Sequence, residues 1–450
     1  MENIILDNIP KQEITAEEKN NSIDYEKVLD AAMKIGIGLL SSGGSVSRVE
    51  IAVERICKAY GAEEVSCAAF PSMVIGSIKL ASGHEYSLLK RVQSTSNNLA
   101  LLEKYNQLSR DICSEKYPPD VALEKINELA HSKARNRWIS ILGAGSVGAI
   151  YSMFFGGTFA DILPALIITT MMAGLNELLS TRSLNVYATV FILSFFGGLS
   201  SIALCKLLVL CGLQCHCSMV MIGTIMILIP GLMLTNAVRD LFTGDIMSGS
   251  FQIINALLLT VVIAAGYAVA LLALKPITDF VPAPERLSTS WQYYVYFMGA
   301  GTAGTFAIAA FFNLNYKRLG WALLATVPAL AVYLLMDFLL PGQTFVNVLV
   351  TALFAAIVSE FLARVIKTPA TVFIVPSIIA LVPGSALYFA MDALVGGNMA
   401  LAGQNALTCI LTLLGLAVGL CAATVVSRII TPVRFHFGKK KIKENFKGKK

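Results

Sequence analysis

The chain has 450 residues, of which 56 % are hydrophobic and 14 % charged, against about 45–50 % and 25 % in soluble globular domains. Residues 1–137 carry 36 charged side chains and the other 313 residues only 28, with a net charge of +6 for the whole chain. A water-soluble N-terminal part therefore precedes a part that lies in lipid, which excludes a soluble enzyme, a secreted disulfide scaffold and a disordered chain.

The N-terminal part reads as a small α+β domain over residues 24–137, preceded by a polar, disordered segment at 1–23. Apolar spacing predicts helices at 24–40, 45–60, 97–113 and 120–132. Alternating residues at 64–70 and 73–80 predict a hairpin around Pro71-Ser72.

The rest of the chain is predicted to be a polytopic α-helical membrane protein, because a helix that crosses the bilayer needs about 20 apolar residues and lipid forbids unpaired backbone. Ten runs qualify, in a first module at 138–274 and a second at 291–430, joined by an extracytoplasmic linker at 275–290. The predicted spans are 138–156, 159–178, 188–210, 218–236, 251–274, 291–312, 318–338, 344–366, 370–391 and 403–430.

The positive charges predict the orientation. Arg182, Arg239, Lys317, Arg364 and a basic tail at 431–450 fall on one side of a ten-span chain. Cytoplasmic loops collect Lys and Arg, so both termini are expected in the cytoplasm. The tail indicates contact with anionic lipid rather than nucleic acid.

The membrane part repeats itself. Leu142–Gly148 and Met298–Gly304 share a glycine pattern, and Ile227–Gly231 resembles Ala380–Gly384. Each unit has five predicted spans, and five is odd, so the second copy is expected to cross the membrane upside down. Inverted repeats are frequent in secondary transporters, where two opposed halves expose one central site alternately.

The candidate site lies at the paired Pro-Gly sequences, because proline removes a helical hydrogen bond and predicts a break near mid-span. Kinks that only shape packing are the alternative. Acids paired across the repeat are candidates for proton coupling, against interfacial acids that are merely hydrated. The predicted substrate and ion pathway comprises Pro230, Gly231, Asn236, Asp240, Pro383, Gly384, Asp392, Glu177, Asp337 and Glu360.

Three further patterns have two interpretations each. Glu360 and Arg364 stand four residues apart, as a structural ion pair or a gate. The Gly-x-Gly-x-x-Gly strings at Gly143 and Gly299 match a dinucleotide motif, but inside apolar runs they indicate close helix packing. Cys211–Cys217 contains three cysteines and a histidine, and incidental cysteines, with a local disulfide as one form, are favoured over a metal site.

Gly44–Glu50, Lys90–Val92 and Asn98–Arg110 resemble the N-terminal domain of the threonine/serine exporter (ThrE-type) family, and Arg364–Pro376 with Leu381–Gly384 resembles its second membrane module. The resemblance implies a ten-span, multi-pass exporter of the bacterial plasma membrane with a cytoplasmic N-terminal domain. Relatives divided over two polypeptides look like dicarboxylate exporters, so a succinate-like substrate stays an alternative.

Motifs for catalysis or ATP binding are missing from the sequence, so no enzyme activity, cofactor or metal is predicted. The favoured function is a secondary exporter of small polar metabolites, most simply threonine and serine, coupled to protons. A membrane-anchored enzyme and a sensor are the alternatives of other classes. The expected partners are a small-molecule substrate and the lipid membrane, and a homo-oligomer is compatible with the sequence.

Overall fold

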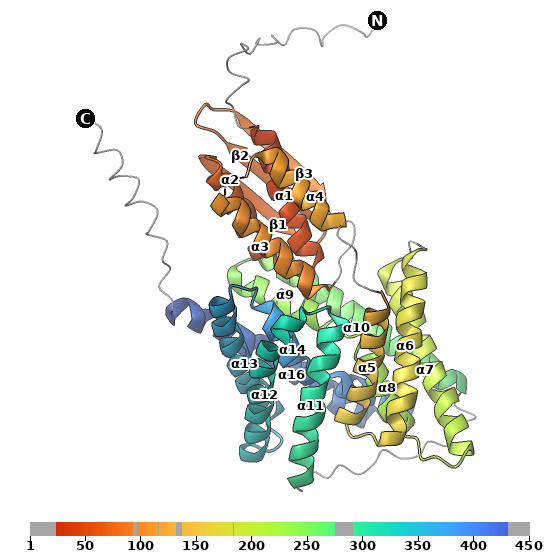
Figure 1. Cartoon of the computed structure of the whole chain (residues 1–450). Coiled ribbons are helices and arrows are strands. Elements are labelled where there is room, and N and C mark those ends of the chain that lie inside the picture. Colours follow the sequence, from red (N-terminus) through yellow and green to blue (C-terminus); the bar gives the residue numbers. More distant parts are fainter. Residues whose placement is uncertain are drawn as a thin grey trace, which may run out of the picture.

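The computed structural model describes residues 24–92, 97–115, 117–131, 137–182, 184–274 and 291–430. The predicted disordered segment at 1–23, the linker at 275–290 and the basic tail at 431–450 lie outside these residues. The described chain forms a small N-terminal domain that sits on one end of a large helical part (Figure 1).

The N-terminal domain is α+β, as the sequence predicts. Its elements are α1 (Tyr25–Ser41), α2 (Val46–Ala59), β1 (Glu64–Phe70), β2 (Met73–Lys79), β3 (Glu85–Arg91), α3 (Leu99–Glu115) and α4 (Pro119–His131). The three strands form an antiparallel meander in the order β1-β2-β3. The hairpin around Pro71-Ser72 is confirmed, with Phe70 opposite Met73, whereas the third strand was not predicted.

Helix α1 is the centre of this domain's core and packs against α2, α3, α4 and the sheet. Two glycines permit the close approaches. A Cβ on Gly38 would lie 2.4 Å from the ring of Tyr105 in α3, and one on Gly76 of β2 would lie 2.8 Å from Sδ of Met33. Both distances are shorter than van der Waals contact, so only glycine leaves room for α3 and for the sheet at these points.

The helical part has an element in each predicted span. The first module contains α5 (Arg137–Phe154), α6 (Phe159–Ser180), α7 (Val186–Leu210), α8 (Cys217–Ile225), α9 (Gly231–Thr243) and α10 (Ile246–Leu274). The second contains α11 (Trp291–Phe311), α12 (Tyr316–Leu339), α13 (Thr344–Ile366), α14 (Thr371–Ile378), the 3-10 turn η3 (Ile379–Leu381), α15 (Gly384–Val395) and α16 (Met399–Ile430).

Eight segments of the described chain are long and apolar enough to cross a membrane, with α14 to α15 as one of them. Two predicted spans are not among the eight. Helix α5 is 18 residues long, and the fourth span is divided into α8 and α9, the latter ending seven residues beyond the predicted limit of 236. A multi-pass helical membrane protein is therefore confirmed, while the count of ten stays a prediction.

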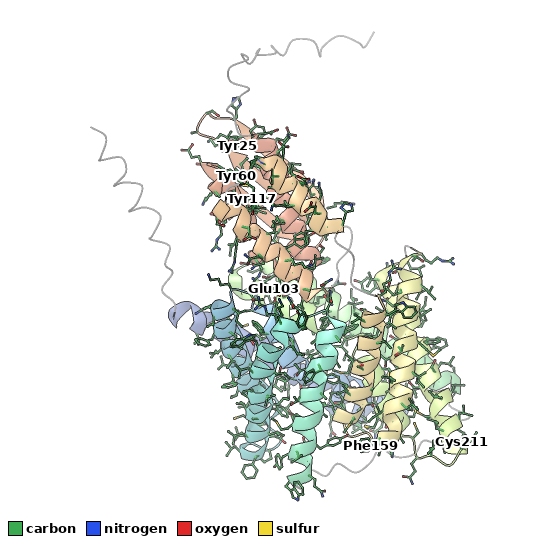
Figure 2. All side chains as sticks on the ribbon, viewed as in Figure 1. Tyr25, Tyr60, Glu103, Tyr117, Phe159 and Cys211 are labelled. Carbon is green, nitrogen blue, oxygen red and sulfur yellow. The ribbon has the colours of Figure 1, made fainter. Side chains whose placement is uncertain are left out.

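The N-terminal domain docks on the loop between α11 and α12. The backbone N–H of Leu99 donates to the carbonyl of Phe312 at 2.9 Å, and Glu103 of α3 forms an ion pair with Arg318 of α12 at 2.6 Å. Figure 2 shows Glu103 at this junction, with Phe159 and Cys211 at the opposite end of the helical part. The described end of α16 lies on the same end as the N-terminal domain (Figure 1).

Candidate functional site

Both Pro-Gly sequences interrupt their helices, and the two interruptions have the same geometry. Pro230 has φ −78° and ψ 51° before α9, and Pro383 has φ −78° and ψ 52° before α15. In each, the glycine N–H bonds the carbonyl two residues back, Gly231 to Ile229 and Gly384 to Val382, both at 2.8 Å. This hydrogen bond is that of an inverse γ-turn, so the chain turns sharply and a new half-helix begins.

The two breaks lie against each other. A Cβ on Gly384 would be 2.7 Å from Sδ of Met226 and 2.8 Å from Cδ1 of Ile229, and one on Gly231 would be 3.4 Å from Cγ2 of Val382. Each break therefore contacts the residues that precede the other one. Sequences 153 residues apart form one site, at which the N-termini of two half-helices meet.

A cavity of about 540 Å³ reaches the second break from the end opposite the N-terminal domain. It runs past the α5–α6 loop and the first turns of α11 and α13 to α15 and α16. None of the described side chains that line it is charged. Its polar groups are the hydroxyls of Thr158, Tyr293, Tyr296, Tyr333, Thr344, Ser385, Thr408 and Thr412 and the amide of Gln292.

Asn236 and Asp240 extend from α9 toward the N-terminal domain, not toward this cavity. The Asn236 amide donates to the carbonyl of Gly43 in the α1–α2 turn at 3.0 Å. Asp240 is fully buried and accepts hydrogen bonds from Gln252 at 2.7 Å and from the backbone N–H of Val46. Because Val46 is the first residue of α2, an acid of the membrane part caps a helix of the N-terminal domain.

The remaining predicted acids are not brought together. Glu177 lies in the last turn of α6 and Asp337 in the last turn of α12, both half-buried, and Asp392 is exposed in the last turn of α15. Helices α6 and α12 end at opposite ends of the helical part (Figure 1). Glu360 pairs with Arg364 at 3.6 Å beside the N-terminal domain, so the ion pair is confirmed and its use as a gate stays a prediction.

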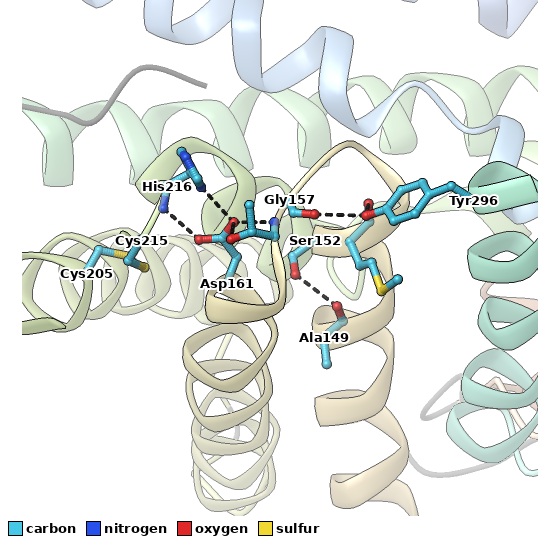
Figure 3. A network of polar contacts seen from close by, with 10 residues as sticks. Ala149, Ser152, Gly157, Asp161, Cys205, Cys215, His216 and Tyr296 are labelled. Carbon is cyan, nitrogen blue, oxygen red and sulfur yellow. Dashed lines mark hydrogen bonds and ion pairs between the residues drawn. The ribbon is translucent and has the colours of Figure 1, made fainter. Parts of the chain in front are cut away.

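One buried acid, Asp161, was not among the residues predicted from the sequence. It accepts hydrogen bonds from the backbone N–H of His216 at 2.6 Å and from its ring Nδ1 at 2.9 Å, and from the backbone and hydroxyl of Thr158 at 2.6 and 2.9 Å. Figure 3 shows these groups converging where α6 begins. Asp161 thus fastens the loop before α8 to α6, beside the cavity that Thr158 lines. The sequence did contain a signal for this network, because Thr158-x-x-Asp161 matches the capping-box pattern that marks the start of a helix.

The residues of the cysteine motif, Cys211–Cys217, lie in different surroundings. Cys211 is exposed, while Cys215 and Cys217 are buried, and the Cys215 thiol lies 2.9 Å from that of Cys205 in α7. The ring Nδ1 of His216 is engaged by Asp161. No group of three or more metal-binding side chains occurs in the part of the chain that the structure describes.

The glycine strings act in helix packing, as predicted, through Gly143 and Gly148 in the first string and Gly301, but not Gly299, in the second. A Cβ on Gly143 would lie 2.8 Å from the backbone N of Phe311, so α5 and α11 touch through their backbones. Gly148 in the same string lets Thr169 of α6 approach, because a Cβ there would be 2.0 Å from its hydroxyl. Neither string follows a strand, so the dinucleotide interpretation is excluded.

Comparison with known proteins identifies the family. The model of the ThrE threonine/serine exporter family matches residues 30–274, and a second, described as "Threonine/Serine exporter, ThrE", matches residues 300–426. The chain belongs to the ThrE family of threonine/serine exporters. ThrE proteins are transporters, so the interpretations as an enzyme or a sensor are set aside. The residues between the two matches, 275–299, include the predicted linker between the two membrane modules.

Two curated ThrE relatives are similar to this chain. The "Threonine/serine exporter" of Corynebacterium glutamicum is 24 % identical over 416 residues, which are 91 % of this chain and 84 % of the relative. The "Probable threonine/serine exporter" of Mycobacterium tuberculosis is 24 % identical over 254 residues, 56 % of this chain and 47 % of the relative. No solved structure matches the chain significantly.

Proposed function

We propose that this chain is a secondary exporter that moves threonine and serine across the plasma membrane by alternating access. The observation that carries the proposal is the contact between two helix breaks of equal geometry, Pro230-Gly231 and Pro383-Gly384. Half-helix ends and unwound backbone at a repeat interface are what many secondary transporters use to hold a substrate. Packing alone does not require both breaks to meet at one place.

Inverted five-helix repeats are supported by which helices pack together. Half-helix α9 of the first module packs on α16 of the second, and α15 of the second packs on α10 of the first. A two-fold axis that relates the modules exchanges α9 with α15 and α10 with α16, so each of these two contacts is the counterpart of the other. The same axis relates α5 to α11, and these two helices also pack together. The proposed ten spans then comprise α5, α6, α7, α8–α9 and α10, followed by α11, α12, α13, α14–α15 and α16.

The cavity at the second break favours a zwitterion over a dicarboxylate. Its lining is uncharged, and the N-terminal end of α15, which carries Ser385 into the lining, offers backbone N–H groups and a positive dipole end to one carboxylate. Hydroxyl groups suit the ammonium and hydroxyl of serine or threonine. A second carboxylate would be desolvated there without a cation, at a cost of several kcal/mol.

Orientation and coupling belong to the same proposal. The N-terminal domain and the end of α16 lie on one end of the helical part (Figure 1), which fits two cytoplasmic termini. The cavity then opens to the outside, and the N-terminal domain closes the inner side. Coupling to protons is proposed through acids near each face, Asp240 on the inner side and Asp392 on the outer, with Glu177 and Asp337 as the second pair.

Counter-flow in proteoliposomes tests the function. Vesicles loaded with serine should accumulate labelled threonine and serine, recovered chemically unchanged, and should not accumulate labelled succinate. Ser385→Ala should raise the KM for serine, while Thr260→Val, on the α10 helix and bonded to its own backbone, should leave it unchanged. Succinate exchange without serine exchange would replace the proposal by the dicarboxylate alternative. Exchange of none of the three would reject it.

A further inference from the structure

A second cavity lies between the two parts of the molecule, away from the helix breaks. Its volume is about 900 Å³, within the range of small-molecule sites. It is bounded by α2 and α3 of the N-terminal domain and by the end of α13 with the loop that leads to α14. Its lining comprises charged side chains, serine and threonine hydroxyls, the Asn106 amide and a few small or aliphatic side chains.

The charged groups of this cavity are mostly cationic. Arg48 and Arg55 stand seven residues apart on one face of α2, Arg110 comes from α3, and Arg364 and Lys367 come from the end of α13. The one acid is Glu360, which pairs with Arg364 at 3.6 Å. Among the described lining residues, five cations and one anion leave an excess of four positive charges around one space, and such an excess attracts anions.

The remaining lining specifies the kind of anion. Serine and threonine hydroxyls and the Asn106 amide supply neutral hydrogen-bond donors beside four guanidinium groups, whose fork geometry matches phosphate oxygens. The described lining contains no aromatic side chain, so there is no platform on which a base could stack. Recognition is thus directed at phosphate groups, and the excess charge suits a ligand that carries several negative charges.

We propose that this cavity binds a multiply charged phosphate compound, which holds the N-terminal domain against the membrane part. The cations come from both parts, so the anion would bridge them. Helix α2 links this cavity to the transport site, because its first residue, Val46, bonds Asp240 on α9, and α9 begins at the first helix break. An anion that fixes α2 therefore acts on α9, and its effect on transport rests on the proposed exporter function.

Binding is measured first, on the purified full chain in neutral detergent. Inorganic pyrophosphate should raise the unfolding temperature of the protein, and titration calorimetry should detect its binding. The measured affinity should fall as the salt concentration rises. Arg55→Gln with Arg110→Gln should weaken binding roughly tenfold or more, the loss of two charge-assisted bonds. The matched control, Lys58→Gln with Lys104→Gln, removes two exposed cations from the same helices outside the cavity and should bind normally. Equal weakening in both pairs would overturn the proposal, and so would a natural chain that neither binds pyrophosphate nor is stabilised by the phospholipid of the next experiment.

A second experiment distinguishes a lipid headgroup from a soluble phosphate compound as the ligand. Nanodiscs of phosphatidylcholine with and without cardiolipin, whose headgroup carries two phosphates, are compared without pyrophosphate. Stabilisation by cardiolipin, lost in the double arginine variant, assigns the cavity to a lipid headgroup, whereas binding of pyrophosphate in detergent assigns it to a soluble ligand. Either result supports recognition of a multiply charged phosphate.

Transport gives the third measurement. Pyrophosphate on the side of the N-terminal domain should change the rate of serine counter-flow in the natural chain and in the lysine control, but not in the arginine variant. If serine exchange is absent while pyrophosphate still binds, the proposed function fails and the binding site stands. If serine exchange proceeds and pyrophosphate binds without changing its rate, the regulatory part is overturned.

Discussion

Gly231 rests against Val382: a Cβ on the glycine that follows the first break would lie 3.4 Å from Cγ2 of the residue that precedes the second. The contact joins residues more than 150 positions apart in the sequence. It makes the two breaks one structural unit, so a change at one proline should be felt at the other.

Replacing Pro230 or Pro383 by alanine should reduce serine counter-flow by about tenfold or more. Alanine has an N–H and a free φ, so the helix can close over the break and withdraw the polar groups exposed there. Insertion and folding should be preserved. Pro328→Ala is the control, because Pro328 lies inside the unbroken helix α12. Normal exchange by both break variants would show that the substrate binds elsewhere.

Gly143→Ala and Gly299→Ala form a matched pair across the repeat. A methyl group at Gly143 meets the backbone of Phe311, whereas one at Gly299 meets nothing within 4 Å. Gly143→Ala should therefore destabilise the protein by about 1–3 kcal/mol. Gly299→Ala should be neutral or stabilise it by up to about 1 kcal/mol, the usual preference for alanine in a helix. Thermal unfolding in detergent measures both, and equal effects would contradict the packing assigned to these glycines.

Asp161→Ala should release the loop that precedes α8. The substitution removes the acceptor for His216 and Thr158, and leaving a buried hydrogen-bond donor without an acceptor costs about 1–3 kcal/mol. The buried Cys215 should then react faster with maleimide, while the exposed Cys211 should react at the same rate in both proteins. Mass spectrometry of the modified peptides separates the two sites. An unchanged rate at Cys215 would mean that Asp161 does not hold the loop.

Glu50→Gln should stabilise the protein at neutral pH and lose this advantage in acid. Burial of Glu50 in the N-terminal domain raises the pKa of its carboxyl group, the Ala69 N–H lowers it, and nearby Asp245 raises it. An acid with a raised pKa binds its proton more tightly in the folded state, so its charge costs stability above that pKa. As pH falls through the raised pKa the cost disappears. Unfolding temperatures from pH 8 to pH 4 measure the difference, and a constant difference would refute the assignment.

Labelling of intact cells tests the orientation. An impermeant maleimide should modify Cys211, which is exposed at the end opposite the N-terminal domain. A cysteine introduced at the exposed Lys58, in a background without the other cysteines of the N-terminal domain, should react only after the cells are opened. The reverse pattern would place the N-terminal domain outside.

Local patterns in the sequence predicted most of the helices and both breaks, because hydrophobic runs and Pro-Gly pairs act within a few residues. Strand β3 was missed for a physical reason. Its inward-facing positions are Tyr86, Leu88 and Lys90, and Lys90 lies inward because it pairs with Asp30 of α1, while Leu89 faces solvent. The apolar-polar alternation is therefore lost at the end of the strand.

The function of the acids depends on contacts that no local pattern contains. Asp240 follows its helix break by ten residues, and that spacing suggested proton coupling but did not indicate its hydrogen-bond partner, the N–H of Val46 in another domain. The cations of the phosphate cavity likewise come from three helices and become neighbours only when the N-terminal domain docks. Spacing along the chain predicts neither arrangement, since both are set by tertiary packing.

The proline at each break also limits how its half-helix can move. The pyrrolidine ring fixes φ, so ψ is the one backbone dihedral left to rotate at Pro230 and at Pro383. At 51° and 52° it stands roughly 90° from its helical value. At each proline, therefore, only one backbone bond can rotate, and the residues beside the two bonds contact each other. A rearrangement between opposed states can then be described by two coupled angles.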